Sequence, residues 1–368
     1  MDTVVLRMNV SVKLSFVLLF PAIMIGLLVA YSSANDKQQN FIRNFSSIRL
    51  TRLDSTRLPV NSFALIKMEG NRLIIHSRIA QRLLMQIDLG TLDTASTIIP
   101  DPGLEAIRFQ NPRVLMSDHN IFIADARART LLTLPDTADA TFSKNEIPTY
   151  SLIMPTSDTT FVLRTYSALA EQDILTWIDV KSGERKDNDS ALQKQIDGIF
   201  CVDGNILFNR SLQRIVYVYY YRNEFIVSDA RLKTVRRGRT IDQTDSALIQ
   251  VDTFENSGQV TTTFKSPPHF VNVKNATDGD YLYVLSNVKA INQERAAFES
   301  TYTIDQYSLI TMTYNGSFIL LPPKDRHELK NFDFAVSGDK LIAIFDDNLV
   351  VYRIDFNSQI PQSEQDPK

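Results

Sequence analysis

The chain has 368 residues, of which 44% are hydrophobic, so it is long enough to bury one large core or two ordinary ones. Its 39 Lys and Arg against 42 Asp and Glu give a formal net charge of −3, which argues against general affinity for nucleic acid or anionic lipid. The one cysteine, Cys201, excludes an intrachain disulfide and a cysteine-based zinc cluster.

The amino-terminal residues indicate an exported chain. Arg7 and Lys13 precede an uncharged run, Leu14–Ala34, that is apolar as far as Tyr31. Positive charge before an apolar run keeps the amino terminus in the cytoplasm and sends the following residues across the membrane. The segment Leu14–Tyr31 is long enough to span as a helix, so we expect a retained anchor at the inner membrane with the remainder facing the periplasm. The alternative is a signal peptide cleaved after Ala34, in "YSSA", with release into the periplasm.

From about residue 43 onward, short apolar runs alternate with tight polar turns. Six stretches share one form, in which a strand is followed by a Gly or Asp turn and a second apolar strand. Gly and Asp suit such turns because hairpins often require positive φ. The six stretches are "FALIKMEGNRLIIHS", "RVLMSDHNIFIADA", "YSLIMPTSDTTFVLRT", "GIFCVDGNILFN", "HFVNVKNATDGDYLYVLS" and "FDFAVSGDKLIAIFD", and their turns centre on Gly70, Asp118, Asp158, Gly204, Gly279 and Gly338.

Other features recur in step with these hairpins. A proline precedes the first strand at Pro59, Pro112, Pro148 and Pro268, and a strand ending in Ile-Asp follows at Ile87-Asp88, Ile178-Asp179, Ile304-Asp305 and Ile354-Asp355. Repeats of about 40–50 residues are typical of four-stranded propeller blades. Two spacings are longer and predict insertions within Asp229–Lys265 and Lys289–Tyr302; the first insertion could hold a degenerate seventh blade.

We therefore predict an all-β fold, a β-propeller of six blades with seven as the alternative. The expected organisation is a signal anchor or signal peptide over residues 1–34, a linker over 35–42, the propeller over 43–356 and a polar tail over 357–368.

The stretch "RIVYVYYYRNEFIVSD" tests this prediction locally. Ile215, Tyr217, Tyr219 and Tyr221 should share one face of a strand, and Val216, Val218 and Tyr220 the other. Two apolar faces are expected of a strand packed between neighbouring blades. This interpretation is favoured over a nucleic-acid stacking surface because aromatic and β-branched residues are the usual strand formers. The basic run Arg231–Arg239 is expected to be a solvated outer strand or loop.

The six hairpins and their Ile-Asp strand ends resemble the six-bladed, TolB-like β-propellers, of which exported members are common in Bacteroidetes. The resemblance covers about residues 43–356 and rests on loose repeats such as "DGNILFN" and "SGDKLIAIFDD". There is no WD dipeptide, kelch double glycine or Asp-box, so the resemblance implies an architecture and no particular activity.

Triplets made of Asp, then Ser or Thr, then a small residue also fit an origin in Bacteroidetes, because these bacteria attach O-glycans at such sequences. They occur at Asp54, Asp93, Asp136, Asp158, Asp189 and Asp245. The alternative is that Asp-Ser/Thr pairs simply form turns.

No catalytic motif stands out, and we predict no catalytic residue, no metal site and no cofactor. The acidic stretches "DNDS" (Asp187–Ser190) and "TDGD" (Thr277–Asp280) favour turns over calcium sites. His119 and His269 have no clustered partners, and Cys201 is expected to be a buried hydrophobe.

The function that this pattern favours is a non-enzymatic, extracytoplasmic binding or scaffold module. Its expected partner is a protein or small ligand at the channel mouth, because the loops of a propeller converge there. The alternative is a propeller enzyme, such as a lyase, hydrolase or dehydrogenase subunit, with residues scattered over several blades.

Overall fold

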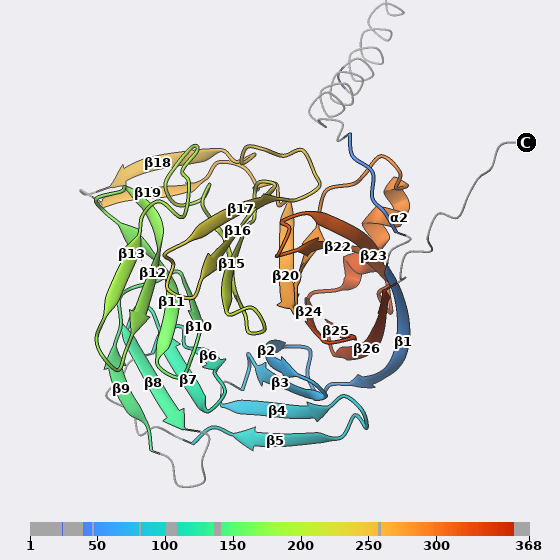
Figure 1. Cartoon of the computed structure of the whole chain (residues 1–368), viewed down its shortest axis with the longest axis horizontal. Coiled ribbons are helices and arrows are strands. Elements are labelled where there is room, and N and C mark those ends of the chain that lie inside the picture. The colour runs from blue at the N-terminus through green and yellow to red at the C-terminus, as the bar shows by residue number, and fades with distance from the viewer. Residues whose placement is uncertain are drawn as a thin grey trace, which may run out of the picture. The chain divides into compact units, whose positions relative to one another are not determined.

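The computed structural model describes residues 40–45, 48–80, 82–100, 109–135, 141–256 and 259–356, together with residue 24. These residues form six four-stranded antiparallel sheets around a central channel, a six-bladed β-propeller (Figure 1). The predicted all-β fold and its resemblance to six-bladed propellers are confirmed. Within residues 40–356, the described helical elements are α2 (Arg295–Ser300) and the 3-10 turn η1 (Arg326–Glu328).

The predicted membrane segment Leu14–Tyr31 and the tail over residues 357–368 lie outside the described residues, residue 24 excepted. Among the residues that are described, no helix has both the length and the apolar character needed to cross a membrane.

Five blades are each built from four strands that follow one another in the chain, with the first strand at the channel and the fourth at the rim. Blade 1 contains β2 (Phe63–Glu69), β3 (Arg72–Ser77), β4 (Leu83–Asp88) and β5 (Thr94–Ile98). Blade 2 contains β6 (Arg113–Met116), β7 (Asn120–Asp125), β8 (Thr130–Pro135) and β9 (Ser143–Glu146). Blade 3 contains β10 (Leu152–Pro155), β11 (Thr160–Ser167), β12 (Gln172–Asp179) and β13 (Arg185–Asn188).

Blade 4 contains β14 (Gly204–Asn209), β15 (Arg214–Tyr219), β16 (Glu224–Asp229) and β17 (Val235–Arg239). A separate hairpin, β18 (Val251–Asn256) and β19 (Gln259–Phe264), follows it. Blade 5 contains β20 (Asn272–Asp278), β21 (Tyr281–Ser286), β22 (Tyr302–Ser308) and β23 (Tyr314–Leu320), with α2 inserted between its second and third strands.

Blade 6 joins the two ends of the propeller. It contains β24 (Phe332–Ser337), β25 (Lys340–Phe345) and β26 (Asn348–Phe356), and its outer strand is β1 (Ile48–Arg57) from the beginning of the propeller. The pairing of β1 with β26 is antiparallel from Ile48↔Phe356 to Arg57↔Asn348. Hydrogen bonds between residues about 300 positions apart thus close the ring.

A buried ion pair holds the segment before β1 against blade 5. The guanidinium of Arg43 donates through Nε to Oδ1 of Asp305 at 2.7 Å and through Nη2 to Oδ2 at 2.9 Å. Both side chains are essentially inaccessible to solvent, with exposed fractions of 0% and 2%. Nη1 also donates to the Val288 carbonyl and Nη2 to the Ser286 hydroxyl. The buried guanidinium therefore has hydrogen-bond acceptors in addition to Asp305.

The tyrosine-rich strand β15 packs between two blades, as its sequence predicts. Tyr217 and Tyr219 lie in an apolar cluster with Trp177 of blade 3, while Val216 and Val218 contact Leu282 and Val284 of blade 5. Both faces are therefore core surfaces. The basic run that follows includes β17, the outer strand of its blade, as expected.

Three of the predicted turn glycines occupy the left-handed region: Gly70, Gly279 and Gly338 have φ of +55°, +52° and +60°. The fourth hairpin was predicted wrongly. Gly204 is the first residue of β14, and the turn lies at Arg210–Gln213. A Cβ at Gly204 would lie 2.3 Å from the carbonyl oxygen of Val218, so this glycine permits close strand contact.

The stretch before Gly204 is a turn because Asp197 organises it. The Asp197 carboxylate accepts hydrogen bonds from the backbone N–H groups of Ile199 and Phe200 at 2.7 and 2.5 Å. Such Asx-type bonds compete with extended structure. The first predicted insertion does not form a seventh blade. The described residues of Asp229–Lys265 contain β17, which belongs to blade 4, and the two-stranded β18–β19 sheet.

Replacing Arg43 with methionine should lower the free energy of unfolding by about 3–5 kcal/mol, because Asp305 is left charged and buried. The double variant Arg43→Met/Asp305→Leu should recover most of this loss. Urea titration followed by circular dichroism measures both.

Arg57 is the matched control, because its pair with Asp347 leaves the Arg57 side chain 80% exposed. Arg57→Met should change the unfolding free energy little. A loss below about 1 kcal/mol for Arg43→Met would show that the buried pair does not secure the fold.

Candidate functional site

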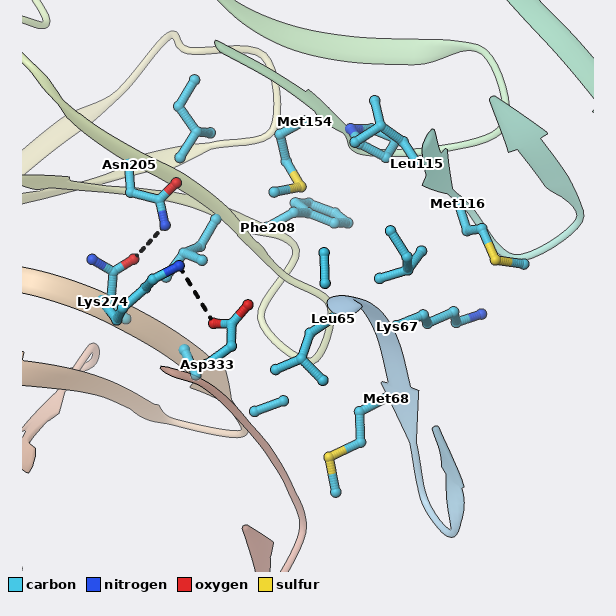
Figure 2. Close-up of a pocket in the computed structure, with 18 of the residues that line it drawn as sticks. Leu65, Lys67, Met68, Leu115, Met116, Met154, Asn205, Phe208, Lys274 and Asp333 are labelled. Carbon is cyan, nitrogen blue, oxygen red and sulfur yellow. Dashed lines mark hydrogen bonds and ion pairs between the residues drawn. The ribbon is translucent and has the colours of Figure 1, made fainter. Parts of the chain in front are cut away.

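A cavity of about 820 Å³ runs along the propeller axis and is lined by the innermost strands of all six blades, β2, β6, β10, β14, β20 and β24. Its size falls within the range of small-ligand pockets. Figure 2 shows side chains from several of these strands projecting toward one another around the cavity.

The two ends of the channel differ in the chain segments that surround them. At one end, the turn face, each inner strand enters a short turn to the second strand of its blade. At the other end, the loop face, lie the connections between blades and between second and third strands. This face carries the long segments 189–203, 240–271, 287–301 and 321–331. Binding residues are found disproportionately on such loops.

An ionic bridge crosses the channel at the turn face. Asp118, in the blade 2 turn, accepts a hydrogen bond from Lys67 Nζ of blade 1 at 3.0 Å and forms an ion pair with Arg210 of blade 4. The hydrogen bond from Lys67 holds the pKa of the Asp118 carboxyl below its ordinary value, and the charge of Arg210 acts in the same direction. Blades 1, 2 and 4 are thereby connected across this end.

Neighbouring turns on the same face also bind one another. The Gly70 N–H donates to the Ser337 hydroxyl at 3.2 Å, and the Gly338 N–H donates to Asp278 Oδ2 at 2.8 Å. Ser117 donates to Asp158 at 2.5 Å. Hydrogen bonds between turns thus connect neighbouring blades at this end of the channel.

The middle of the channel is apolar. Its wall includes Leu65, Leu115, Met154, Leu207 and Phe208, all partly exposed to the cavity. Met154 of blade 3 and Phe208 of blade 4, both labelled in Figure 2, pack against the same apolar cluster. Methionine adapts its shape to irregular apolar ligands, so this wall suits an apolar body without demanding one shape.

Polar side chains line the channel near the loop face. Asn205 donates to Asn275 Oδ1 at 2.8 Å, joining blades 4 and 5, and Lys274 Nζ lies 3.7 Å from Asp333 Oδ1, joining blades 5 and 6 (Figure 2). Arg113, the first residue of β6, is exposed here. This end combines charged and amide groups with an apolar interior.

An aromatic group borders the same mouth. Tyr220 lies just beyond the end of β15 and lines the cavity, with its ring 5.7 Å from that of Phe270. Tyr221 lies 5.0 Å from Phe270 and 5.9 Å from Phe264 of β19. Burial raises the pKa of the Tyr220 hydroxyl, and the charge of Asp203 acts in the same direction, while Arg113 and Arg164 oppose it.

The structure does not place the candidate residues His119, His269 and Cys201 in one common site. His119 is exposed on the turn face and His269 is exposed in a loop before blade 5, at the other end. Cys201 is buried, with 1% of its surface exposed, as predicted, and its thiol donates to the Asp197 carbonyl. Within the described part of the chain, no group of three or more His, Cys, Asp or Glu side chains is arranged to hold a metal ion.

Both acidic stretches serve local structure. Asp187 accepts from Thr176 at 2.7 Å and from Arg185 at 2.9 Å, and Asp278 receives the Gly338 N–H. Among the Asp-Ser/Thr triplets, Asp93, Asp158, Asp189 and Asp245 lie in turns or loops, Asp54 lies in β1, and Asp136 lies outside the described residues.

Sequence reasoning missed the residues that line the channel. The alternation of residues predicts Tyr220 on a core face with Val218, but β15 ends at Tyr219 and Tyr220 lines the channel. The sequence does contain one signal for the channel lining: single polar residues within otherwise apolar inner strands, such as Lys67, Asn205 and Asp333.

No protein-family model and no curated protein sequence matches the chain. Solved structures do resemble it. A DUF4221 family member from Bacteroides vulgatus has a TM-score of 0.52 at 12% identity, over 84% of this chain and 99% of that one. An identity this low shows a shared fold and nothing about activity.

Two further structures are similar to a lesser degree. One is a protein from Bacteroides fragilis, with a TM-score of 0.48 at 11% identity, over 87% of this chain and 98% of that one. The other is a virginiamycin B lyase from Staphylococcus aureus, with a TM-score of 0.44 at 11% identity, over 83% of this chain and 99% of that one.

Replacing Asp118 with asparagine should release Arg210 and loosen Lys67, because the amide carries no charge. Lys67 then keeps Glu69, 3.0 Å from its Nζ, as its ion-pair partner among the described residues. Lys67, whose side chain is 11% exposed, should then react several-fold faster with an amine-acetylating reagent, measured by peptide mass spectrometry. Global stability should change little, since exposed ion pairs contribute roughly 0–1 kcal/mol.

Asp280→Asn is the control, because Asp280 is an exposed turn-face carboxylate without a hydrogen-bond or ion-pair partner in the described residues. It should leave the labelling of Lys67 unchanged. Equal labelling in the Asp118 variant and the native chain would mean that the bridge does not restrain Lys67.

Proposed function

We propose that this chain is a binding module whose propeller takes a small ligand, or the end of a partner chain, into its central channel from the loop face. The observation that carries the proposal is the asymmetry of the channel. Lys67, Asp118 and Arg210 span the turn face, whereas the loop face gathers the long connections and a set of exposed polar groups. A pocket of this size with an apolar wall and few polar groups is suited to ligand binding.

The proposal includes a location on the far side of the cytoplasmic membrane. Its support is the amino-terminal pattern, in which Arg7 and Lys13 precede the apolar run Leu14–Tyr31. On this account the module is held at the periplasmic surface of the inner membrane, or released if the chain is cleaved after Ala34.

The channel is tested by placing an indole in it. Ala335 lines the cavity on the inner strand of blade 6, and Ala335→Trp should weaken the binding of small probes at least tenfold by occupying their space. Three probes each carry a phenyl ring on a short alkyl chain: 4-phenylbutyrate, 4-phenylbutyl phosphate and 4-phenylbutan-1-ol. Ligand-observed NMR titration of the full chain gives their dissociation constants.

Ala95→Trp is the control, because Ala95 is exposed on the outer strand of blade 1. It should leave binding unchanged, and circular dichroism should show both variants folded. The proposal fails if none of the probes binds the native chain, or if Ala335→Trp leaves the binding of every probe intact. Turnover of a substrate that Ala335→Trp abolishes would make the protein an enzyme instead.

The location is tested by expressing the full chain in a Gram-negative bacterium and sequencing the amino terminus of the mature product. A retained anchor predicts an unprocessed chain that stays with membranes after a carbonate wash, and cleavage predicts a chain that begins at Asn35 in the periplasm. A full-length chain that is soluble in the cytoplasm would contradict both outcomes.

A further inference from the structure

The loop-face mouth of the channel has an excess of positive charge. Three cationic side chains line the cavity at this end: Arg78 follows β3, Arg113 begins β6, and Lys274 lies near the start of β20. The carboxylate that lines the same end is Asp333, and it is already engaged by Lys274 at 3.7 Å. Two positive charges therefore remain without a counter-charge in the described lining.

Those two charges belong to Arg78 and Arg113. Both residues are exposed, and neither guanidinium has a hydrogen-bond or ion-pair partner among the residues that the structure describes. The other arginine on the channel, Arg210 at the turn face, is paired with Asp118. Guanidinium groups bind carboxylate and phosphate oxygens through charge-assisted hydrogen bonds, so an open arginine pair at a pocket mouth favours an anion.

A second, independent observation is a buried amide donor at this end of the channel that lacks a hydrogen-bond acceptor among the described residues. Asn275 is 8% exposed and lines the cavity, and its Oδ1 accepts from Asn205 while its Nδ2 has no partner among the described residues. A buried amide donor without an acceptor is unfavourable, and an oxygen atom of a ligand in the channel could accept its hydrogen bond.

Behind this mouth the cavity becomes apolar. Leu115 and Met154 lie further along their strands than the mouth residues Arg113 and Leu152, and Phe208 lies closer still to the turn face. At the turn face, Lys67 and Arg210 both form ion pairs with Asp118. A ligand that fills the channel from the loop face therefore meets cations first and apolar side chains next.

We infer that the ligand is an amphipathic anion, with a carboxylate or phosphate head between Arg78 and Arg113 and an apolar body along Leu115, Met154 and Phe208. This inference rests on the proposed function, because it specifies the ligand of the same channel. The shared chemistry is one anionic head on an apolar body. Carboxylate and phosphate heads are separate arms of the test.

The test compares the three probes on the full chain, because they differ in the head group while their phenylalkyl bodies differ by at most one methylene. Binding of 4-phenylbutyrate, of 4-phenylbutyl phosphate or of both should be at least fivefold tighter than that of 4-phenylbutan-1-ol. Arg78→Gln and Arg113→Gln should each weaken binding of the preferred anion about fivefold, the upper range for an exposed charge pair, and leave the alcohol unchanged. Higher salt should reduce the preference for the anion.

Arg185→Gln is the matched control, because Arg185 is an exposed arginine on the outer strand of blade 3, away from the cavity. It should change the affinity for none of the probes. The two proposals fail in different ways. If all three probes bind equally and neither arginine variant alters this, the anionic ligand is ruled out while the binding channel stands. If no probe binds the native chain, the channel itself is ruled out as a binding site, and the inference falls with it.

Discussion

Closure of the ring is the constraint on which the rest of this structure depends. Six blades enclose a channel only if the last is completed by the first strand of the propeller, which here is the pairing of β1 with β26. The buried Arg43–Asp305 pair fixes the segment before β1 to blade 5, next to the blade that β1 completes. A buried charge pair is not a large source of stability, but its geometry permits few alternatives, so it specifies where this segment must lie.

A closed ring also explains why the two ends of the channel can differ. The strands alternate in direction within each blade, so all short turns between first and second strands collect on one face and the connections between blades collect on the other. Insertions can then lengthen one face without disturbing the strands. In this chain the loop face carries the insertions, and its Arg78 and Arg113 have no ion-pair partner among the described residues. The turn face is bridged by Lys67, Asp118 and Arg210.

The architecture could be predicted because its signals are local. Gly70, Gly279 and Gly338 stand where a hairpin needs positive φ, and the alternation of apolar residues around them indicates strands directly. Gly204 misled the prediction because a glycine needed for close contact with Val218 looks the same in sequence as one needed for a turn. The closing strand β1 has no such signal, since its partner lies about 300 residues away.

The site could not be predicted for the same reason. Arg78, Arg113 and Asn275 come from three different blades, and nothing in their local sequence shows that they face one channel. Their association follows from ring geometry, which appears only after the blades are counted and closed. The polar residues of the inner strands were the available clue, because a fully buried strand has little use for a charged side chain.

The most direct test of the account is a crystal structure of the full chain with the more tightly bound of the two anionic probes. The account predicts the carboxylate or phosphate head within hydrogen-bonding distance of Arg78 and Arg113, the phenyl ring against Met154 and Phe208, and the bridge of Lys67, Asp118 and Arg210 intact at the far end. A probe bound on the outer face of the blades, or one that enters the channel through the turn face, would contradict it.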